Sequence, residues 1–226
     1  FPKQFFDVGI CESHAVAFAA GQCKAGSRPI VDIYSTFLQR SFDQIFQEVA
    51  LQDLPVVFML DRAGLTGPDG PTHHGLFDIS YMRLFPNMVC MAPAYASELQ
   101  LMLDFAIKHE HPTSIRYPKA SALQTEHTPD PIKLGKSEIL RQGVDGTIIA
   151  YGAMLENALD AAELLAGEMD ITVINARFVK PIDGEMVRQS LSGGQFVITL
   201  EEGTQLGGFG SAFLESAAQQ GLDTRS

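Results

Sequence analysis

The amino-acid sequence predicts an α/β protein with two three-layer α/β/α domains, each built on a mostly parallel sheet. Short apolar runs alternate with stretches of helical periodicity, which is typical of βαβ units rather than of hairpins. The 226 residues exceed the length of most single domains. With 46% apolar and 19% charged side chains, the chain can bury sizeable cores, and we do not expect it to be disordered.

The first domain is expected over residues 1–122. Its strand candidates are runs rich in Val, Ile or Met, at residues 29–34, 55–61, 88–93 and 113–117. Its helix candidates alternate with these strands, at residues 12–24, 38–52 and 97–109. The first helix is rich in alanine and ends at Gly26, and the last begins at Ser97, a favourable N-cap residue. These elements predict one α/β unit.

Residues 123–145 are expected to form a linker, because the periodicity stops and prolines and glycines become frequent. The alternation restarts in a second, smaller α/β domain over residues 146–226. Its strand candidates are residues 147–151, 171–175 and 196–200. Its helix candidates are residues 156–167, 183–191 and 209–220.

Composition and charge argue against several classes of protein. The formal net charge is −11, so an extended phosphate backbone would be repelled, and we expect no nucleic-acid partner. Cys11, Cys23 and Cys90 are odd in number and form no C-x-x-C pair, which argues against a disulfide framework or a zinc site. No apolar stretch is long enough to span a bilayer, so we expect no membrane association and a reducing cytoplasm.

The segment between the second and third expected strands, residues 62–75, is long for a loop inside a compact domain. It combines Arg62, Asp69, His73 and His74 with four glycines. The loop follows the carboxyl end of a strand, where open parallel sheets place their ligands. We therefore favour a functional loop.

Several candidate residues keep two interpretations on sequence alone. Glu12 opens the alanine-rich helix, where the helix dipole stabilises a carboxylate without any ligand, and His14 beside it is more often a satisfied or exposed histidine than a catalyst. The side chains of His73 and His74 diverge, so a shared metal is not expected. One of them could shuttle a proton, or it could simply be solvated.

The strand ends offer further candidates. Arg62 and Arg116 each close a strand and could bind a phosphate together at one rim of the sheet, although exposed strand-end arginines are common. Phe37 lies in a strand-to-helix turn, where it could pack in the core or stack on a flat ring. Gly207 and its neighbours precede the last helix and could bind an anion or only allow close helix packing.

Six strings of this sequence occur together, in order, along the chain. They are FFDVGICESHAV (5–16), YSTFLQR (34–40), DRAG (61–64), DGPTH (69–73), IRYP (115–118) and ARFVKPID (176–183). With these strings the chain resembles the 1-deoxy-D-xylulose 5-phosphate synthases, thiamine diphosphate enzymes of the transketolase superfamily. The resemblance covers essentially all 226 residues and implies a pyrimidine-binding domain followed by a transketolase C-terminal domain.

The resemblance implies an enzyme that decarboxylates pyruvate on thiamine diphosphate and condenses the two-carbon unit with glyceraldehyde 3-phosphate. The product would be 1-deoxy-D-xylulose 5-phosphate, a precursor of non-mevalonate isoprenoids, thiamine and pyridoxal. By the same resemblance, Glu12 would bond to N1′ of the aminopyrimidine and favour the imino tautomer that deprotonates the thiazolium ring. Phe37 would stack on the pyrimidine.

The remaining roles that the resemblance implies concern the substrates. Arg62 and Arg116, with Tyr34, would hold the phosphate of the aldehyde, and Arg40 would contribute at the rim. Asp69 would contact substrate hydroxyl or carboxyl groups. His73 would do the same and would also take part in catalysis.

The resemblance also implies what lies outside this sequence. The synthases hold the diphosphate and Mg2+ on a separate N-terminal domain with a Gly-Asp-Gly motif, which does not occur here. We therefore expect no metal ligand in this chain and no product from the chain alone. The chain has no initiator Met, so we expect a fragment of a longer protein. The resemblance implies that the family's C-terminal domain continues beyond Ser226, so we expect a truncated second domain. The family further implies a homodimer in a bacterial cytoplasm, or in a plastid if the source is a plant or alga.

Two other functions remain open on the sequence. The β subunit of a 2-oxo acid dehydrogenase has the same domain order, a partner subunit that supplies the diphosphate site, and a lipoyl group as acceptor. A non-catalytic assembly module would be indifferent to Glu12→Ala, whereas an enzyme of this superfamily would lose its activity.

Overall fold

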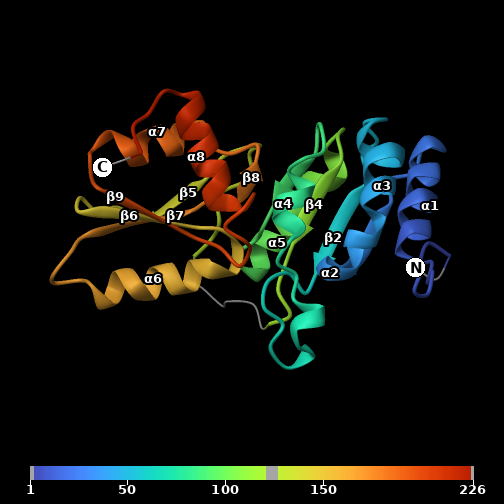
Figure 1. Cartoon of the computed structure of the whole chain (residues 1–226), viewed down its shortest axis with the longest axis horizontal. Coiled ribbons are helices and arrows are strands. Elements are labelled where there is room, and N and C mark those ends of the chain that lie inside the picture. The colour runs from blue at the N-terminus through green and yellow to red at the C-terminus, as the bar shows by residue number, and fades with distance from the viewer. Residues whose placement is uncertain (1–2, 121–126, 225–226) are drawn as a thin grey trace.

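The computed structural model describes residues 3–120 and 127–224, and it contains two sheets side by side with helices packed on them (Figure 1). The first sheet has five strands in the order β1-β2-β4-β3-β8. Their bounds are β1 Ile30–Tyr34, β2 Val57–Asp61, β3 Val89–Met91, β4 Thr113–Arg116 and β8 Phe178–Lys180. All neighbours are parallel except β8, which runs antiparallel to β3. The four parallel strands are those expected from the sequence.

Alternating residues of β2 explain why this sheet has a helix layer on each face. Phe58 and Leu60 point into one core with α1 and the segment after α2, whereas Val57 and Met59 point into another core with α5. The helices of this domain are α1 Glu12–Lys24, α2 Ser35–Leu38, α3 Phe42–Gln44, α4 Asp78–Met82 and α5 Ala96–Lys108. The helix expected over residues 38–52 is a succession of short pieces that ends in a π-helical turn, Ile45–Ala50.

The second sheet has four strands in the order β5-β7-β6-β9, and it also has helices on both faces. The strands are β5 Glu138–Arg141, β6 Gly146–Ala150, β7 Ile171–Asn175 and β9 Phe196–Leu200. The helices are α6 Leu155–Leu164 on one face, and α7 Gly184–Ser192 and α8 Phe209–Gln219 on the other. The prediction of an α/β fold with mostly parallel sheets is confirmed.

The structure differs from the sequence-based expectation in the segment expected to be a linker. Residues 123–126 lie outside the described part, but residues 138–141 of the same segment form β5, an antiparallel edge strand beside β7. A four-residue strand is too short to show a period of two, and β5 contributes only Ile139 and Leu140 as apolar residues. Strand β8 was missed for the same reason.

A buried ion cluster joins the two domains. Arg177, only 2% exposed, donates from Nε to Glu98 of α5 over 2.7 Å and from Nη2 to Glu138 of β5 over 2.6 Å. Asn175 and the backbone N–H of Ala94 also donate to Glu98. Every charge here is paired and hydrogen-bonded, as a buried ion requires. The cluster therefore fixes how the second domain sits on the first.

Candidate active site

Parallel strands β1 and β2 end together, and this edge carries the candidate site. Tyr34, the last residue of β1, is in register with Asp61, the last residue of β2. Phe37 follows on the short helix α2, and Arg62 follows β2 directly. Side chains at the carboxyl ends of adjacent parallel strands meet at one edge, which is where such sheets bind ligands.

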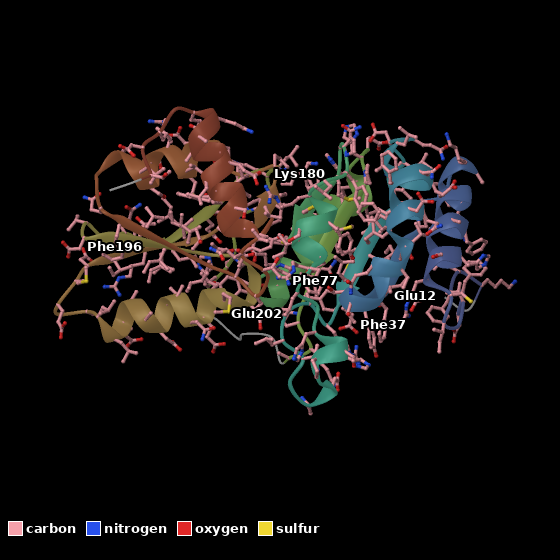
Figure 2. All side chains as sticks on the ribbon, viewed as in Figure 1. Glu12, Phe37, Phe77, Lys180, Phe196 and Glu202 are labelled. Atoms are coloured by element: carbon pink, nitrogen blue, oxygen red, sulfur yellow. The ribbon has the colours of Figure 1, made fainter. Side chains whose placement is uncertain are left out.

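Helix α1 brings Glu12 to the same place. The side chain of Glu12 lies in the first turn, and Arg40 Nη1 is 2.9 Å from its Oε1. The hydroxyl of Ser13 donates to the carbonyl of Arg40, which ties the start of α1 to the segment after α2. Figure 2 shows Glu12 and Phe37 on these neighbouring elements. The Glu12 side chain is 11% exposed, so its charge is paired and largely shielded.

Aromatic and cationic groups continue this line of contacts. The guanidinium of Arg40 lies 5.1 Å from the centroid of the Phe37 ring, and Phe37 stacks on Tyr34 at 5.4 Å. The Arg62 guanidinium also lies over the Tyr34 ring, at 3.7 Å from its centroid. His73 meets the edge of Phe37 at 5.3 Å. A cation over an aromatic face is favourable, and the two arginines therefore flank an aromatic platform.

The loop over residues 62–75 supplies the acidic part of the site. Asp69 lies 3.7 Å from Nε of Arg62 and accepts two hydrogen bonds of 2.8 Å from Lys119. The hydrogen bond from Lys119 is the main reason why the pKa of Asp69 is lower than usual, with smaller effects of Lys119, Arg62 and His73 charges. Asp61 also pairs with Arg62. Asp69 is therefore a carboxylate held between two cations.

The two ends of this loop are pinned to each other. Gly64 and Gly75 exchange backbone hydrogen bonds of 2.8 and 2.9 Å. Arg62 has a left-handed backbone with φ of 58°, which turns the chain sharply out of β2. Within the loop, Nδ1 of His74 accepts from the N–H of Thr66 over 3.1 Å. His74 thus braces the loop, while His73 faces the aromatic platform.

The structure buries Arg116, so it is not the exposed strand-end arginine that was one of the two interpretations of the sequence. Its guanidinium is 8% exposed and paired with the buried Asp78 at 2.8 Å. Further donations go to the carbonyls of Gly75 and Glu202. Burial opposes its charge, but Asp78 more than compensates and the net effect is a raised pKa of Arg116. Strand order alone could not reveal Asp78, which lies 38 residues earlier in the sequence.

Two weaker candidates have local structural roles. The backbone N–H groups at the start of α8, at Phe209 and Gly210, donate to the Glu201 carboxylate over 2.7 and 3.0 Å. An internal carboxylate thus takes the anion position that the glycines suggested for a phosphate. His14 is exposed and stacks on Phe18 at 5.9 Å, outside the site.

Sequence reasoning missed Lys119, Asp32 and Tyr117. Tyr117 donates from its hydroxyl to Asp32 over 2.9 Å, and burial together with Asp32 raises the pKa of Tyr117. Burial is also the main cause of the raised pKa of Asp32. Their position in the sequence could have indicated a site, since Tyr117 and Lys119 come just after the strand that ends at Arg116. What the sequence could not give was the pairing across the sheet edge.

Two buried polar atoms at the site have no hydrogen-bond partner in the protein, the Arg62 Nε and the Ser35 hydroxyl. Buried polar groups are normally paired, so both mark capacity for a ligand or water. In the part of the chain that the structure describes, no three His, Cys, Asp or Glu side chains could hold a metal ion. No described helix is long and apolar enough to cross a membrane.

Comparisons with protein families match both halves of the chain. The transketolase pyrimidine-binding domain family matches residues 1–124, and the transketolase C-terminal domain family matches residues 135–225. A 1-deoxy-D-xylulose-5-phosphate synthase of Rhodopirellula baltica is 75% identical over 226 residues, which are 100% of this chain and 36% of that protein. Synthase 2 of Geobacter sulfurreducens is 51% identical over 98% of this chain and 36% of its own length. The chain therefore spans about a third of the length of these relatives.

Solved structures agree with the families. A split-gene transketolase, described as an inactive β4 tetramer, aligns with a TM-score of 0.89 and 32% identity, covering 97% of this chain and 72% of that one. A transketolase from Leishmania mexicana has a TM-score of 0.76 at 19% identity, over 88% of this chain and 31% of that one, and so shares the fold. With both domain families matched and the site residues assembled at the sheet edge, this chain belongs to the transketolase family.

Proposed function

We propose that this chain is the pyrimidine-binding and C-terminal part of a 1-deoxy-D-xylulose 5-phosphate synthase. Such an enzyme joins the two-carbon unit of pyruvate to glyceraldehyde 3-phosphate and releases CO2. The observation that carries the proposal is the continuous line of contacts from Glu12 through Arg40, Phe37 and Tyr34 to Arg62. The 75% identity to the Rhodopirellula baltica synthase over the whole chain supports this substrate pair. We propose a first domain over residues 1–122 and a second domain that begins before residue 146, since it includes β5.

The residues at this edge fit the aminopyrimidine end of thiamine diphosphate. Glu12 offers a shielded carboxylate that can hold a proton at a pyrimidine ring nitrogen, and Phe37 offers an aromatic face for stacking. When bound, the cofactor would supply the carbon nucleophile that stores the electron pair left by decarboxylation. Arg40 pairs with Glu12 over 2.9 Å and orients its carboxylate. The diphosphate and Mg2+ would be held outside this chain.

The loop side of the edge fits the substrates. Arg62 carries a buried, unpartnered Nε beside Asp69 and presents a guanidinium suited to a phosphate. His73 lies close enough to the platform to exchange a proton with a substrate hydroxyl, and Asp69 fixes the cations around it. Arg116 would help to hold the phosphate: its Nε and Nη2 are engaged by Asp78 and by two carbonyls, which leaves Nη1 without a hydrogen bond among the described residues. The ring of Tyr34 packs against the guanidinium of Arg62 and helps to position it.

The assembled enzyme would be a homodimer in the cytoplasm of a bacterium, as the synthase relatives are bacterial proteins. The competing 2-oxo acid dehydrogenase subunit is less well supported, because the most similar relatives are named as synthases. A purely structural module would not need a shielded carboxylate, an aromatic platform and an arginine with a free buried donor at one edge.

The proposal can be tested by replacing the matching segment of the Rhodopirellula baltica synthase with these 226 residues. The grafted enzyme should form deoxyxylulose phosphate from pyruvate and glyceraldehyde 3-phosphate, detected by mass spectrometry. Glu12→Ala should lower its turnover by roughly a hundredfold or more, as loss of a positioned proton-transfer group does. The isolated 226-residue chain, given Mg2+ and thiamine diphosphate, should form no product.

The matched control is Glu163→Ala, which removes an exposed carboxylate from α6 in the second domain and should leave turnover unchanged. Use of a lipoyl acceptor in place of glyceraldehyde 3-phosphate would favour the dehydrogenase. Full activity of the Glu12→Ala graft would remove the proposed role of Glu12.

A further inference from the structure

Glu202 of the second domain contacts the loop of the candidate site. Glu202 follows β9 after one residue, and Figure 2 shows it at the junction of the two domains, toward the loop. Neither the sequence strings nor the proposed chemistry gives it a role. Its side chain nevertheless contacts residues 62–75 directly, and its backbone carbonyl accepts from Arg116, which also donates to Gly75 of the loop.

The side chain of Glu202 contacts the first end of the loop. Its Oε1 accepts a hydrogen bond of 3.2 Å from the N–H of Leu65. A Cβ at Gly64 would lie 2.6 Å from Cδ of Glu202, and Gly64 has φ of 80°. A residue with a side chain would be strained there and would push Glu202 away. The glycine therefore permits a close approach between the carboxylate and the loop backbone.

The backbone of Glu202 acts on the other end of the loop through Arg116. Nη2 of Arg116 donates to the Glu202 carbonyl over 2.8 Å and to the Gly75 carbonyl over 3.3 Å. Gly64 and Gly75 are hydrogen-bonded to each other, so Glu202 bears on one end of the loop directly and on the other end through Arg116. Arg116 is itself fixed by Asp78.

The side-chain contact of Glu202 is not needed to hold the domains together. The Arg177 cluster does so in the buried interior, and Ser80 of α4 bonds to Thr204 and to the Leu206 carbonyl. Arg83 adds a hydrogen bond of 2.7 Å to the Gly207 carbonyl. The effect particular to the Glu202 carboxylate is therefore on the loop that carries Arg62, Asp69 and His73.

We propose that Glu202 is a positioning residue: its carboxylate fixes the 62–75 loop from the second domain, so that Arg62, Asp69 and His73 stay against the aromatic platform. The structural part of this proposal stands on the contacts of Glu202, and its catalytic consequence rests on the proposed function. The second domain thereby becomes a determinant of the geometry of a site that lies on the first domain.

The test is amide hydrogen exchange of the 226-residue chain, followed by NMR at Leu65 and by mass spectrometry over residues 63–75. Glu202→Ala should accelerate exchange at Leu65 by roughly tenfold, the effect of losing one hydrogen bond to a charged group. Glu202→Gln keeps an acceptor oxygen of the same reach and should restore exchange to within about threefold. Glu202→Asp, one methylene shorter, should resemble Glu202→Ala.

The control is Ser80→Ala, which removes interdomain hydrogen bonds at another place and should leave the loop amides unchanged. Unchanged exchange at Leu65 in both Glu202→Ala and Glu202→Asp would overturn the proposal, as would equal acceleration in Ser80→Ala. Should Glu202→Ala fail to fold, Glu202→Asp against the unsubstituted chain decides the matter, because both carry a carboxylate and differ by one methylene in reach.

In the grafted synthase, Glu202→Ala should raise KM for glyceraldehyde 3-phosphate several-fold, while Glu202→Gln and Ser80→Ala stay near the unsubstituted graft. A graft that makes no product would count against the proposed function and leave the exchange result standing. An active graft with an unchanged KM in Glu202→Ala would overturn the catalytic consequence alone.

Discussion

Two arginines, Arg62 and Arg177, share the same backbone conformation after a strand but differ in how their guanidiniums are buried and paired. Arg62 immediately follows β2, and Arg177 comes two residues after β7, so both follow a strand of a parallel pair. Both have φ of 58°, in the left-handed region that a residue with a side chain seldom adopts. Each guanidinium also faces two carboxylates, Asp61 and Asp69 in one case, and Glu98 and Glu138 in the other.

The surroundings of the two guanidiniums differ in exposure and in pairing. Arg177 is 2% exposed, and its Nε and Nη2 each donate to a buried carboxylate. Arg62 is 20% exposed, and its Nε lies buried without a hydrogen-bond partner in the protein. The Nε and Nη2 of Arg177 make their hydrogen bonds within the chain, whereas the Nε of Arg62 has none and could donate to a ligand or water.

The contrast shows how one chemical group serves structure or binding. A guanidinium whose carboxylate partners are all buried is costly to disturb, because removing it leaves uncompensated charges in the interior. A guanidinium at an open edge contributes little to folding, but its free donor can be given to a ligand anion. The unusual backbone is shared, so φ alone does not mark a functional residue in this protein.

The largest effect that would test this contrast is loss of Arg177. We expect Arg177→Met to lower the free energy of unfolding by about 3 to 5 kcal/mol, because Glu98 and Glu138 would be left buried without their cation. Denaturant unfolding of the 226-residue chain measures it. Arg188→Met, at an exposed arginine of α7, is the control. A loss below about 1 kcal/mol would mean that the cluster is not what joins the domains.

The second effect concerns binding at Arg62. In the grafted synthase, Arg62→Ala should raise KM for glyceraldehyde 3-phosphate roughly ten- to a hundredfold, which corresponds to hydrogen bonds to a charged group. Arg62→Lys should recover only part of this, because an ammonium cannot present a planar fork. Steady-state kinetics over a range of both substrates checks the expectation. A change confined to KM for pyruvate would reassign Arg62 to the other substrate.

A third, smaller effect concerns Asp183, a carboxylate of the second domain that is hydrogen-bonded within the protein. Asp183 caps α7 and accepts from Ser137 and Lys136. Burial opposes its charge, but these hydrogen bonds prevail and the pKa of Asp183 is lowered. Asp183→Ala should cost about 1 kcal/mol near neutral pH. Urea unfolding of the 226-residue chain and of the Asp183→Ala variant measures this difference.

The sign of the pH effect follows from the lowered pKa of Asp183. A carboxyl group with a depressed native pKa stabilises the fold above its unfolded pKa, near 4, and this contribution disappears as the pH falls through the native pKa. The difference between wild type and Asp183→Ala should therefore shrink below about pH 4. Unfolding curves at a series of acidic pH values measure it, and a difference that grew on acidification would contradict the assignment.

The smallest expected effect sharpens the comparison from the side of Arg62. Arg62→Ala should change the free energy of unfolding of the chain by less than about 1 kcal/mol, because its ion pairs are partly exposed and screened. The same denaturant experiment that follows Arg177→Met gives the value. A loss as large as that of Arg177→Met would show that Arg62 also holds the fold, and the division between the two arginines would be wrong.

Much of the fold could be predicted because its strands carry their own signal. Strands β2, β6 and β7 are short apolar runs that are largely buried, and their spacing with helices predicts parallel pairing. Strands β5 and β8 carry no such signal, since four or three residues cannot display a period and their pairing partners lie far away in the sequence. They were therefore missed, and residues 138–141 were assigned to a linker.

Part of the candidate site could likewise be predicted from the sequence, and part could not. Glu12, Phe37 and Arg62 lie at strand ends and helix starts, which local sequence identifies, and the structure brings them into one line of contacts with Tyr34 and Arg40. The role of Arg116 stays a prediction, and its burial could not be predicted, because it depends on Asp78 and on the carbonyl of Glu202.

The sequence by itself determined the two α/β units and the chemical groups at the sheet edge, because strand periodicity and strand-end position are local properties. Only the tertiary structure decided which charged side chains make their hydrogen bonds within the protein and which keep a donor available to a ligand. Arg62 and Arg177 have the same backbone conformation, and their difference arises from Glu98, Glu138 and the open edge of the first sheet. Burial and pairing depend on residues far apart in the chain, so no local pattern encodes them.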